Sequence, residues 1–296
     1  MTQTSSSYTK AEFMVWRLGQ EVHDWDVIHI GAYTPLVLAA SLLAKATHAP
    51  NARLFPISLS GVWSARTFPL SITMLEPLSM ADGVTYRVTD LFDHVEGDEA
   101  FDFEPLSPAQ IDMFGNLNNS AIGSYERPKV RLPGSAGLDN LLTCPRTKML
   151  IYTTRHTKRV FVPKVDVISA PGYLDGPGAR ERAGIPGNGG PRIVISNLAV
   201  LDFDEATKRM RLQAVNPWTT VQEVQDNTSF ELMIPRVVAT TPEPTDREIE
   251  VLRHEVDPLG IRDLEFAPGP ERRELFRRIL DKEEEWLNSG RVRPPG

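Results

Sequence analysis

The chain lacks most features that mark the common disulfide, nucleotide and membrane proteins. Cys144 is its only cysteine, which excludes a disulfide framework and a cysteine metal cluster. No apolar run approaches the length of about 18 residues that a membrane-spanning helix needs. The motifs GxGxxG and GxxxxGKS/T are also missing, so we expect neither a Rossmann dinucleotide site nor a P-loop.

The overall charge limits the kinds of partner. The net charge is −7 at pH 7, which argues against nucleic acid or an anionic membrane as the main partner. The amino-terminal residues MTQTSSSYTK contain no signal-peptide core, so we expect a cytoplasmic protein. His23 and His29 have no partner at ligand spacing, and we predict no metal site.

The order of apolar runs predicts an α/β fold. A strand over 26–30, a buried helix over 35–47 and a strand over 53–59 form a βαβ unit, whose strands are parallel. A capping pattern, Thr9-x-x-Glu12, predicts a helix from Lys10 to about Val22. Further strands are expected over 101–106, 149–153, 165–169, 192–196, 198–203, 209–214 and 230–234. We therefore predict a three-layer domain with a mostly parallel sheet flanked by helices.

The termini differ in composition from the middle of the chain. We expect a flexible tail over 1–9, the main domain over 10–265 and a charged helical extension over 266–296. The pattern Thr245-x-x-Glu248 predicts a capped helix to about Val256. The extension should form a helix over 270–287 with one narrow apolar stripe: Leu275, Phe276, Ile279 and Leu280.

The most informative stretch is AQIDMFGNLNNSAIGSYERPKVRLPGSAGLDN, residues 109–140. It is rich in Gly, Asn and Ser but lies between predicted strands, and long connections of this kind are usually functional or disordered. Glycine lets the backbone adopt a positive φ or approach a ligand closely. A run of surface turns is the plain alternative and fits the composition equally well.

The motifs of this stretch resemble those of the beta subunits of family I CoA-transferases, glutaconate CoA-transferase above all. That family carries AQID-x-x-GN-x-N-x-x-x-IG and then PK-x-R, followed by a glycine-rich G-x-GG segment in which this chain has Ala136 before Gly137. Later segments match in the same order: RHTKRVFVPKVDVISAPGYLDGPGARER, GGPRIVISNLAVLDFDEATKRM, TTVQEVQDNTSFEL and EVDPLGI. The resemblance implies the CoA-transferase family I fold and covers roughly residues 15–261.

The resemblance also implies a set of site residues. It places AQID at the rim of an acyl-CoA pocket, where N–H groups near Ala109 and Gln110 would stabilise the oxyanion formed on thioester attack. The candidate acyl-CoA contacts are Ser60, Gly61, Ala109, Gln110, Asn116, Gly134 and Gly137. A turn role for Asn116 is equally compatible with its position after Gly115. Gly134 and Gly137 would let backbone amides meet substrate or phosphate at a helix start.

The family nucleophile is missing from the matching position. Glutaconate CoA-transferase has a glutamate before the Ser-Gly pair, and here that position is Leu59, which cannot act as a nucleophile. The nearest spare carboxylate is Glu76, a weak candidate because a lone Glu before Pro is usually a solvated turn. The beta subunit of the actinobacterial cholesterol-ring hydrolase is similar and also lacks this glutamate. There the acting carboxylate belongs to the alpha subunit.

Two activities therefore remain open. The first is a CoA-transferase that moves CoA between an acyl-CoA and a carboxylic acid; the second is a hydrolase that opens a ring in a CoA thioester. A subunit that only completes the pocket is a third possibility. Each implies an alpha subunit in a heterodimer or heterotetramer, with a CoA thioester as substrate and no permanently bound cofactor.

Two other segments are candidates for contacts with ligands or partners. The run Arg155, His156, Lys158 and Arg159 follows a strand and would suit an acidic substrate, although an exposed basic turn explains it as well. The Gly- and Pro-rich loop over 171–190 is too poor in apolar residues for a core and is typical of a segment that caps a site or an interface.

Overall fold

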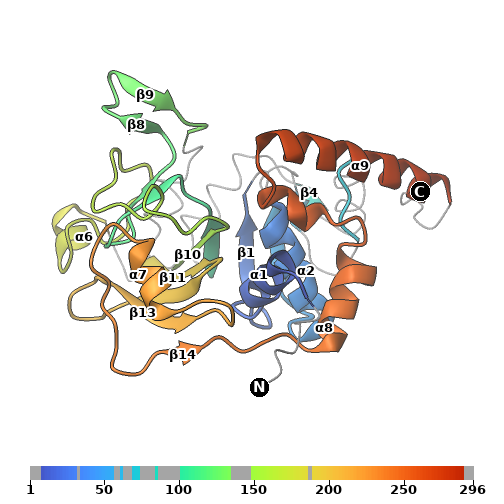
Figure 1. The fold of residues 1–296 in the computed structure, drawn as a ribbon, viewed down its shortest axis with the longest axis horizontal. Coiled ribbons are helices and arrows are strands. Elements are labelled where there is room, and N and C mark those ends of the chain that lie inside the picture. Colours follow the sequence, from blue (N-terminus) through green and yellow to red (C-terminus); the bar gives the residue numbers. More distant parts are fainter. Residues whose placement is uncertain are drawn as a thin grey trace. The chain divides into compact units, whose positions relative to one another are not determined.

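The computed structural model of the protein describes residues 8–31, 34–56, 61–62, 69–73, 84–85, 101–134, 148–185 and 189–289. The chain folds into two compact units (Figure 1). Unit 1 comprises residues 1–88 and 243–296, and unit 2 comprises residues 89–242. The predicted boundaries at residues 9/10 and 265/266 remain predictions.

Unit 1 contains the predicted βαβ unit. The βαβ unit consists of β1 (Val27–Ile30), α2 (Pro35–Thr47) and β2 (Arg53–Pro56). The helix α1 (Lys10–Gly19) precedes it, and the short antiparallel pair β3 (Gly61–Val62) and β4 (Val84–Thr85) follows it. β1 and β2 pair in parallel, with Val27 beside Arg53. α2 is buried from Leu36 to Lys45, as its apolar sequence predicts, and packs against α1.

The carboxyl-terminal part of unit 1 is helical. It consists of α8 (Asp246–Val251), a π-helical turn (Leu252–Val256), a 3-10 helix (Ile261–Glu265) and α9 (Gly269–Asn288). The capping box between Thr245 and Glu248 is confirmed. On α9 only part of the predicted stripe is covered, since Ile279 is 1% exposed and Phe276 is 40% exposed.

An ion-pair network around the buried Glu12 joins the two chain segments of unit 1, residues 1–88 and 243–296. Glu12 caps α1 through the Thr9 N–H and also accepts hydrogen bonds from Arg253 (Nε to Oε1, 2.7 Å) and Arg262 (Nη2 to Oε1, 3.0 Å). Burial raises the pKa of Glu12, but these donors outweigh burial and lower the pKa to about 2. Arg262 also donates to Asp257, which is 1% exposed. The network ties α1 to the segment after α8.

A second buried carboxylate attaches α9. Glu283 is 1% exposed and accepts hydrogen bonds from the N–H groups of Ile72 and Thr73, at 3.1 Å each, and from the hydroxyls of Ser71 and Thr73. Hydrogen bonds to an ionised group are roughly twice as strong as neutral ones. Leu70 N donates to Val256 O at 2.7 Å. Residues 70–73 are therefore held by the carboxyl-terminal helices.

Unit 2 contains a mixed sheet in the order β14-β13-β12-β11-β10-β5. Its elements are β5 (Phe103–Leu106), β6 (Gln110–Ile111), β7 (Leu117–Asn118), β8 (Ala121–Gly123), β9 (Pro128–Arg131), β10 (Lys148–Thr153), α6 (Ala179–Arg182), β11 (Gly190–Ser196), β12 (Ala199–Phe203), β13 (Met210–Val215), α7 (Val221–Asp226) and β14 (Ala239–Thr240). β5, β10 and β11 are parallel, whereas β11, β12 and β13 are antiparallel. The predicted α/β class is confirmed.

Two predicted strands in unit 2 are wrong. Residues 165–169 do not form a strand: among the described residues this segment is held by an isolated bridge between Ala170 and Leu117 and by the side chains of Asp166 and Ser169, which accept from Gly123 N and Asn119 N. Residues 230–234 contribute only an isolated bridge between Met233 and Arg211, and Pro235 then removes a donor. β14 takes the place beside β13 instead.

Within the part of the chain that the structure describes, no helix is both long and apolar enough to cross a bilayer.

Replacing Glu283 tests the attachment of α9. We expect Glu283→Gln to lower the free energy of unfolding by about 2 kcal/mol, because the charge that strengthens its hydrogen bonds is lost. Amide hydrogen exchange at Ile72 and Thr73 should accelerate. Glu284→Gln is the matched control, since Glu284 is exposed on the same helix. Equal exchange in the two variants would contradict the attachment.

Candidate functional site

The stretch that the sequence singled out folds around Asp112. Its carboxylate accepts hydrogen bonds from Phe114 N (3.0 Å), Asn116 N (3.1 Å) and the Asn116 side-chain amide (3.0 Å). Burial raises the pKa of Asp112 even against these hydrogen bonds. Gly115 adopts φ +71°, and an added Cβ would lie 2.7 Å from Pro191 Cγ. This turn therefore requires glycine.

Asn116 joins the turn to a distant loop. It is 2% exposed, and its Oδ1 accepts from Gly172 N (2.9 Å) and Leu174 N (3.0 Å). Its Nδ2 donates to Asp112 and to Leu174 O at 2.9 Å. An asparagine amide has two donors and two acceptor sites, and all four are used within the protein. Asn116 is a brace in this structure, and its predicted contact with acyl-CoA remains a prediction.

Gln110 and Ala109 are also engaged with neighbouring residues. Gln110 Oε1 accepts from Asn118 Nδ2 at 2.7 Å, and Gln110 Nε2 donates to Asp166 Oδ2 at 3.1 Å. Ala109 N donates to Asn119 Oδ1 at 2.8 Å. The same N–H also donates to Asn118 O at 3.2 Å, so an oxyanion could use it only if both acceptors released it. The site role of both residues remains a prediction.

The structure brings part of the predicted set together. Asn119 contacts both Ala109, through its side chain, and Gly134, whose N–H donates to Asn119 O at 2.8 Å. Gly134 has φ +109° with open space where a Cβ would stand. Gly61 is the first residue of β3 in unit 1. Outside the described residues lie four further predicted positions: Leu59, Ser60, Glu76 and Gly137.

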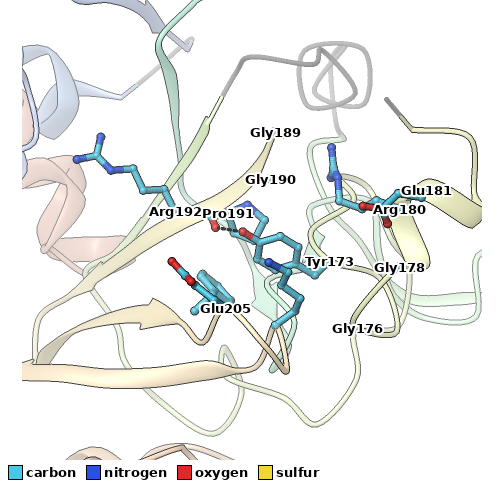
Figure 2. A pocket seen from close by; sticks show the side chains of 12 residues that line it. Tyr173, Gly176, Gly178, Arg180, Glu181, Gly189, Gly190, Pro191, Arg192 and Glu205 are labelled. Carbon is cyan, nitrogen blue, oxygen red and sulfur yellow. Dashed lines mark hydrogen bonds between the residues drawn. The ribbon is translucent and has the colours of Figure 1, made fainter. Parts of the chain in front are cut away.

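A pocket of about 590 Å³ in unit 2 includes part of the loop over residues 172–174 that Asn116 holds, which we call the braced loop. Figure 2 shows Tyr173 within it, with the hydroxyl directed to Pro191 O at 2.9 Å. Phe203 packs edge-on against Tyr173, with ring centroids 5.5 Å apart, and Lys208 Nζ lies 5.3 Å from the centre of the Tyr173 ring. The other charged lining residues are Arg180, Glu181, Arg192 and Glu205.

The pocket combines an aromatic surface with a small excess of positive charge. Arg180 is fixed, because its Nη1 donates to Gly172 O at 2.8 Å. Arg192 extends away from Tyr173 in Figure 2. Such a pocket suits an anionic ligand with a flat or apolar part. The sequence indicated that the glycine-rich loop would cap a site, but no local signal showed that Tyr173 meets Phe203 and Lys208.

His156, in the predicted basic run, is buried and neutral. Its ring stacks on Phe161, with centroids 3.7 Å apart, and its nitrogens lie 2.8 Å from Ser196 Oγ and 2.9 Å from Thr228 Oγ1. Burial lowers the pKa of His156 to about 3. The side chains of Arg155, Lys158 and Arg159 are exposed. The run therefore supplies three surface cations, while His156 supports the core.

Comparison with known families identifies the chain. The family model described as Coenzyme A transferase matches residues 13–227. The chain belongs to this family. The beta (B) subunit of glutaconate CoA-transferase from Acidaminococcus fermentans is 32% identical over 261 residues, covering 86% of this chain and 94% of the relative.

Two further relatives have different activities. The beta (B) subunit of 3-oxoadipate CoA-transferase from Pseudomonas knackmussii is 30% identical, covering 84% of this chain and 93% of the relative. The IpdB subunit of the cholesterol ring-cleaving hydrolase of Mycobacterium tuberculosis is 29% identical, covering 87% and 98%.

Solved structures agree with the predicted fold family. The crystal structure of glutaconate CoA-transferase from Acidaminococcus fermentans aligns with a TM-score of 0.74 at 29% identity, covering 89% of this chain and 99% of that chain. Rhodococcus jostii IpdAB gives a TM-score of 0.74 at 25% identity, covering 89% and 100%. The decarboxylase AibA/AibB gives 0.72 at 27% identity, covering 87% and 98%. The CoA-transferase family I fold is therefore confirmed, and one fold serves several activities.

The bracing role of Asn116 can be measured directly. We expect Asn116→Ala to lower the free energy of unfolding by about 3 kcal/mol, because it leaves the N–H groups of Gly172 and Leu174 without their acceptor and removes the side-chain donor to Asp112. Urea unfolding measures this loss. Asn227→Ala is the control, since Asn227 bonds only within its own helix turn, to Glu223 O at 2.9 Å. Similar losses in both variants would argue against the brace.

His156 predicts a contribution to acid sensitivity. The unfolded chain binds a proton at His156 near pH 6.5, whereas the folded chain binds it only near pH 3. Stability should therefore fall as the pH decreases between these values, by up to about 1.4 kcal/mol per pH unit. Carboxylates also titrate in this range, so the contribution of His156 is measured against the variant His156→Gln. The unfolding free energy of the variant should change less steeply with pH than that of the wild type. In the wild type the imidazole NMR signals of His156 should not titrate between pH 5 and 8.

Proposed function

We propose that this chain is the beta subunit of a heteromeric CoA-transferase, which moves CoA between an acyl-CoA thioester and a carboxylic acid. The main support is similarity to the beta subunits of two CoA-transferases, at 32% and 30% identity over more than four-fifths of the chain. The glycine- and asparagine-rich stretch that suggested this family is ordered and braced from Asp112 to Gly134.

An alpha subunit is part of the proposal. Two of the structurally similar proteins, IpdAB and AibA/AibB, carry names of two components. We infer a heterodimer or heterotetramer in which acyl-CoA binds with help from both chains. The aromatic pocket around Tyr173, where Lys208 lies over the ring, would suit a flat part of such a ligand that carries an anionic group.

The source of the nucleophile is the central chemical question. Transfer needs a carboxylate that attacks the thioester carbonyl and displaces CoA thiolate, which leaves the acyl group on the carboxylate as a mixed anhydride. The thiolate then attacks the carbonyl of the enzyme's own carboxyl group, which releases the acyl group as its acid and leaves CoA on the enzyme as a thioester for the acceptor acid. Leu59 cannot do this, and Glu76 is the weak alternative within this chain. We propose that the acting carboxylate comes from outside position 59.

A hydrolase is the second candidate, and a specific observation favours it. Leu59 removes the carboxylate on which transfer depends in the resembling family, and the hydrolase subunit IpdB is 29% identical over 276 residues. In this alternative, the alpha subunit would hold the acting glutamate and promote ring opening of a CoA-bound compound by water.

Thiol release separates the two candidates. The chain, co-purified with its alpha subunit, is assayed on acyl-CoAs that include glutaconyl-CoA and 3-oxoadipyl-CoA, with and without an acceptor acid. We expect CoA to move to the acceptor with no free thiol, because the mixed anhydride is protected from water. Ring opening at carbon need not release thiol, so the products are also weighed by mass spectrometry.

The outcomes differ for each candidate. Free thiol without acceptor, or a cyclic acyl-CoA whose mass increases by that of one water, would support a hydrolase and contradict transfer. Leu59→Glu should increase the rate of CoA transfer if a carboxylate at this position can still reach the thioester. Leu59→Gln is the uncharged control. If neither transfer nor hydrolysis occurs with any acyl-CoA in the panel, the proposed function is wrong.

A further inference from the structure

In the hairpin of β8 and β9, strand β9 is exposed on both faces, whereas Ala121 at the start of β8 is buried. Ala121–Gly123 and Pro128–Arg131 pair with each other as a two-stranded sheet. The consecutive residues Lys129, Val130 and Arg131 are all exposed. Successive side chains of a strand point to opposite faces, so neither face of β9 is covered by the residues that the structure describes. In Figure 1 the hairpin projects from the rest of unit 2.

The hairpin presents apolar groups to solvent. Tyr125 is 56% exposed at its turn, and Val130 is 51% exposed on β9. The guanidinium carbon of Arg131 lies 5.1 Å from the centre of the Tyr125 ring, so Tyr125 is already held against the strand. An isolated two-stranded hairpin is marginally stable in water, and exposed aromatic and β-branched side chains are typical of a surface that becomes covered.

The base of the hairpin is firmly attached. The Asp166 carboxylate accepts from Gly123 N (3.0 Å) and from Gln110 Nε2 (3.1 Å). Asn118 holds the start of β8 through Ala121 O at 2.7 Å, and Leu132 N donates to Ser120 O at 3.0 Å after β9. A hairpin fixed at its base loses little entropy when it binds, which favours affinity.

The charge of the hairpin identifies the kind of surface that would cover it. Arg127, Lys129 and Arg131 are exposed and cationic, against one exposed acid, Glu126, although the whole chain carries −7. A surface with acidic groups around an apolar centre would complement it. A two-fold contact of hairpin against hairpin between two copies would oppose like charges. The charge therefore favours a different chain.

We propose that the β8–β9 hairpin docks on the alpha subunit, with Tyr125 and Val130 against an apolar patch and with Arg127, Lys129 and Arg131 facing acidic side chains around it. This proposal rests on the proposed heteromeric function. Gln110 and Asp166 join the base of the hairpin to the AQID segment. Docking of the hairpin would therefore place the alpha subunit next to the stretch that carries the predicted acyl-CoA contacts.

Charge reversal on the hairpin is the main test. The full chain carrying Lys129→Glu and Arg131→Glu is titrated with its purified alpha subunit, and we expect binding to weaken about 100-fold. Wild-type binding should also weaken as salt increases. The control carries Arg236→Glu and Arg247→Glu, two exposed cations outside the hairpin and outside every candidate site, with the same charge change. It should bind like the wild type.

A second measurement does not depend on a variant. In the complex with the alpha subunit, hydrogen exchange of amides in residues 124–131 should slow relative to the free chain. Circular dichroism and the unfolding midpoint of the hairpin variant should match the wild type, since the replaced side chains are exposed.

Each other outcome overturns the proposal in a different way. If the hairpin variant and the wild type bind equally to the alpha subunit, the hairpin does not contact that subunit. The cations would then serve only to prevent the exposed strand edge from pairing with other strands, and the heteromer would form through other residues. If the alpha subunit does not bind the wild type, the proposed heteromeric function fails with it. If the chain alone forms a dimer that the hairpin variant loses, a second copy covers the hairpin.

Discussion

Gly172 and Gly115 approach so closely that an added Cβ on Gly172 would lie 2.3 Å from the Gly115 carbonyl carbon. The two backbone segments can approach this closely only because residue 172 lacks a side chain, and Gly115 is needed separately, since it has φ +71° and a Cβ there would meet Pro191 and Phe203. Asn116 holds the contact by bonding to Asp112 on one side and to residues 172–174 on the other. The Tyr173 pocket depends on it, because Tyr173 lies in the braced loop.

Unit 1 uses buried carboxylates for the same purpose. Glu12 holds Arg253 and Arg262 against α1, and Glu283 holds residues 71–73 against α9. Each carboxylate is almost fully buried and each is surrounded by donors, which offsets the cost of removing a charge from water. Both units are therefore assembled by polar groups whose partners lie far away in the sequence.

The family resemblance and the residue-level predictions succeeded to different degrees. The ordered motifs indicated a CoA-transferase fold, and the family model and the solved relatives agree. The helix over 35–47 and both capping boxes were predicted from residues a few positions apart. The strands over 165–169 and 230–234 were wrong because a short apolar alternation does not show whether the fold places a neighbouring strand beside it, and an isolated bridge forms in or directly after each segment instead.

The sequence by itself determined the family, the α/β class and the helix starts, because caps and hydrophobic periodicity act over a few residues. Only the tertiary structure showed which groups Gln110, Asn116 and His156 form hydrogen bonds with. Asn116 meets Gly172 and Leu174 across more than fifty positions, and His156 meets Thr228 across 72. An amide or imidazole has the same chemistry wherever it stands, so its role depends on which distant groups the fold brings to it, and on whether they leave any hydrogen-bonding capacity for a ligand.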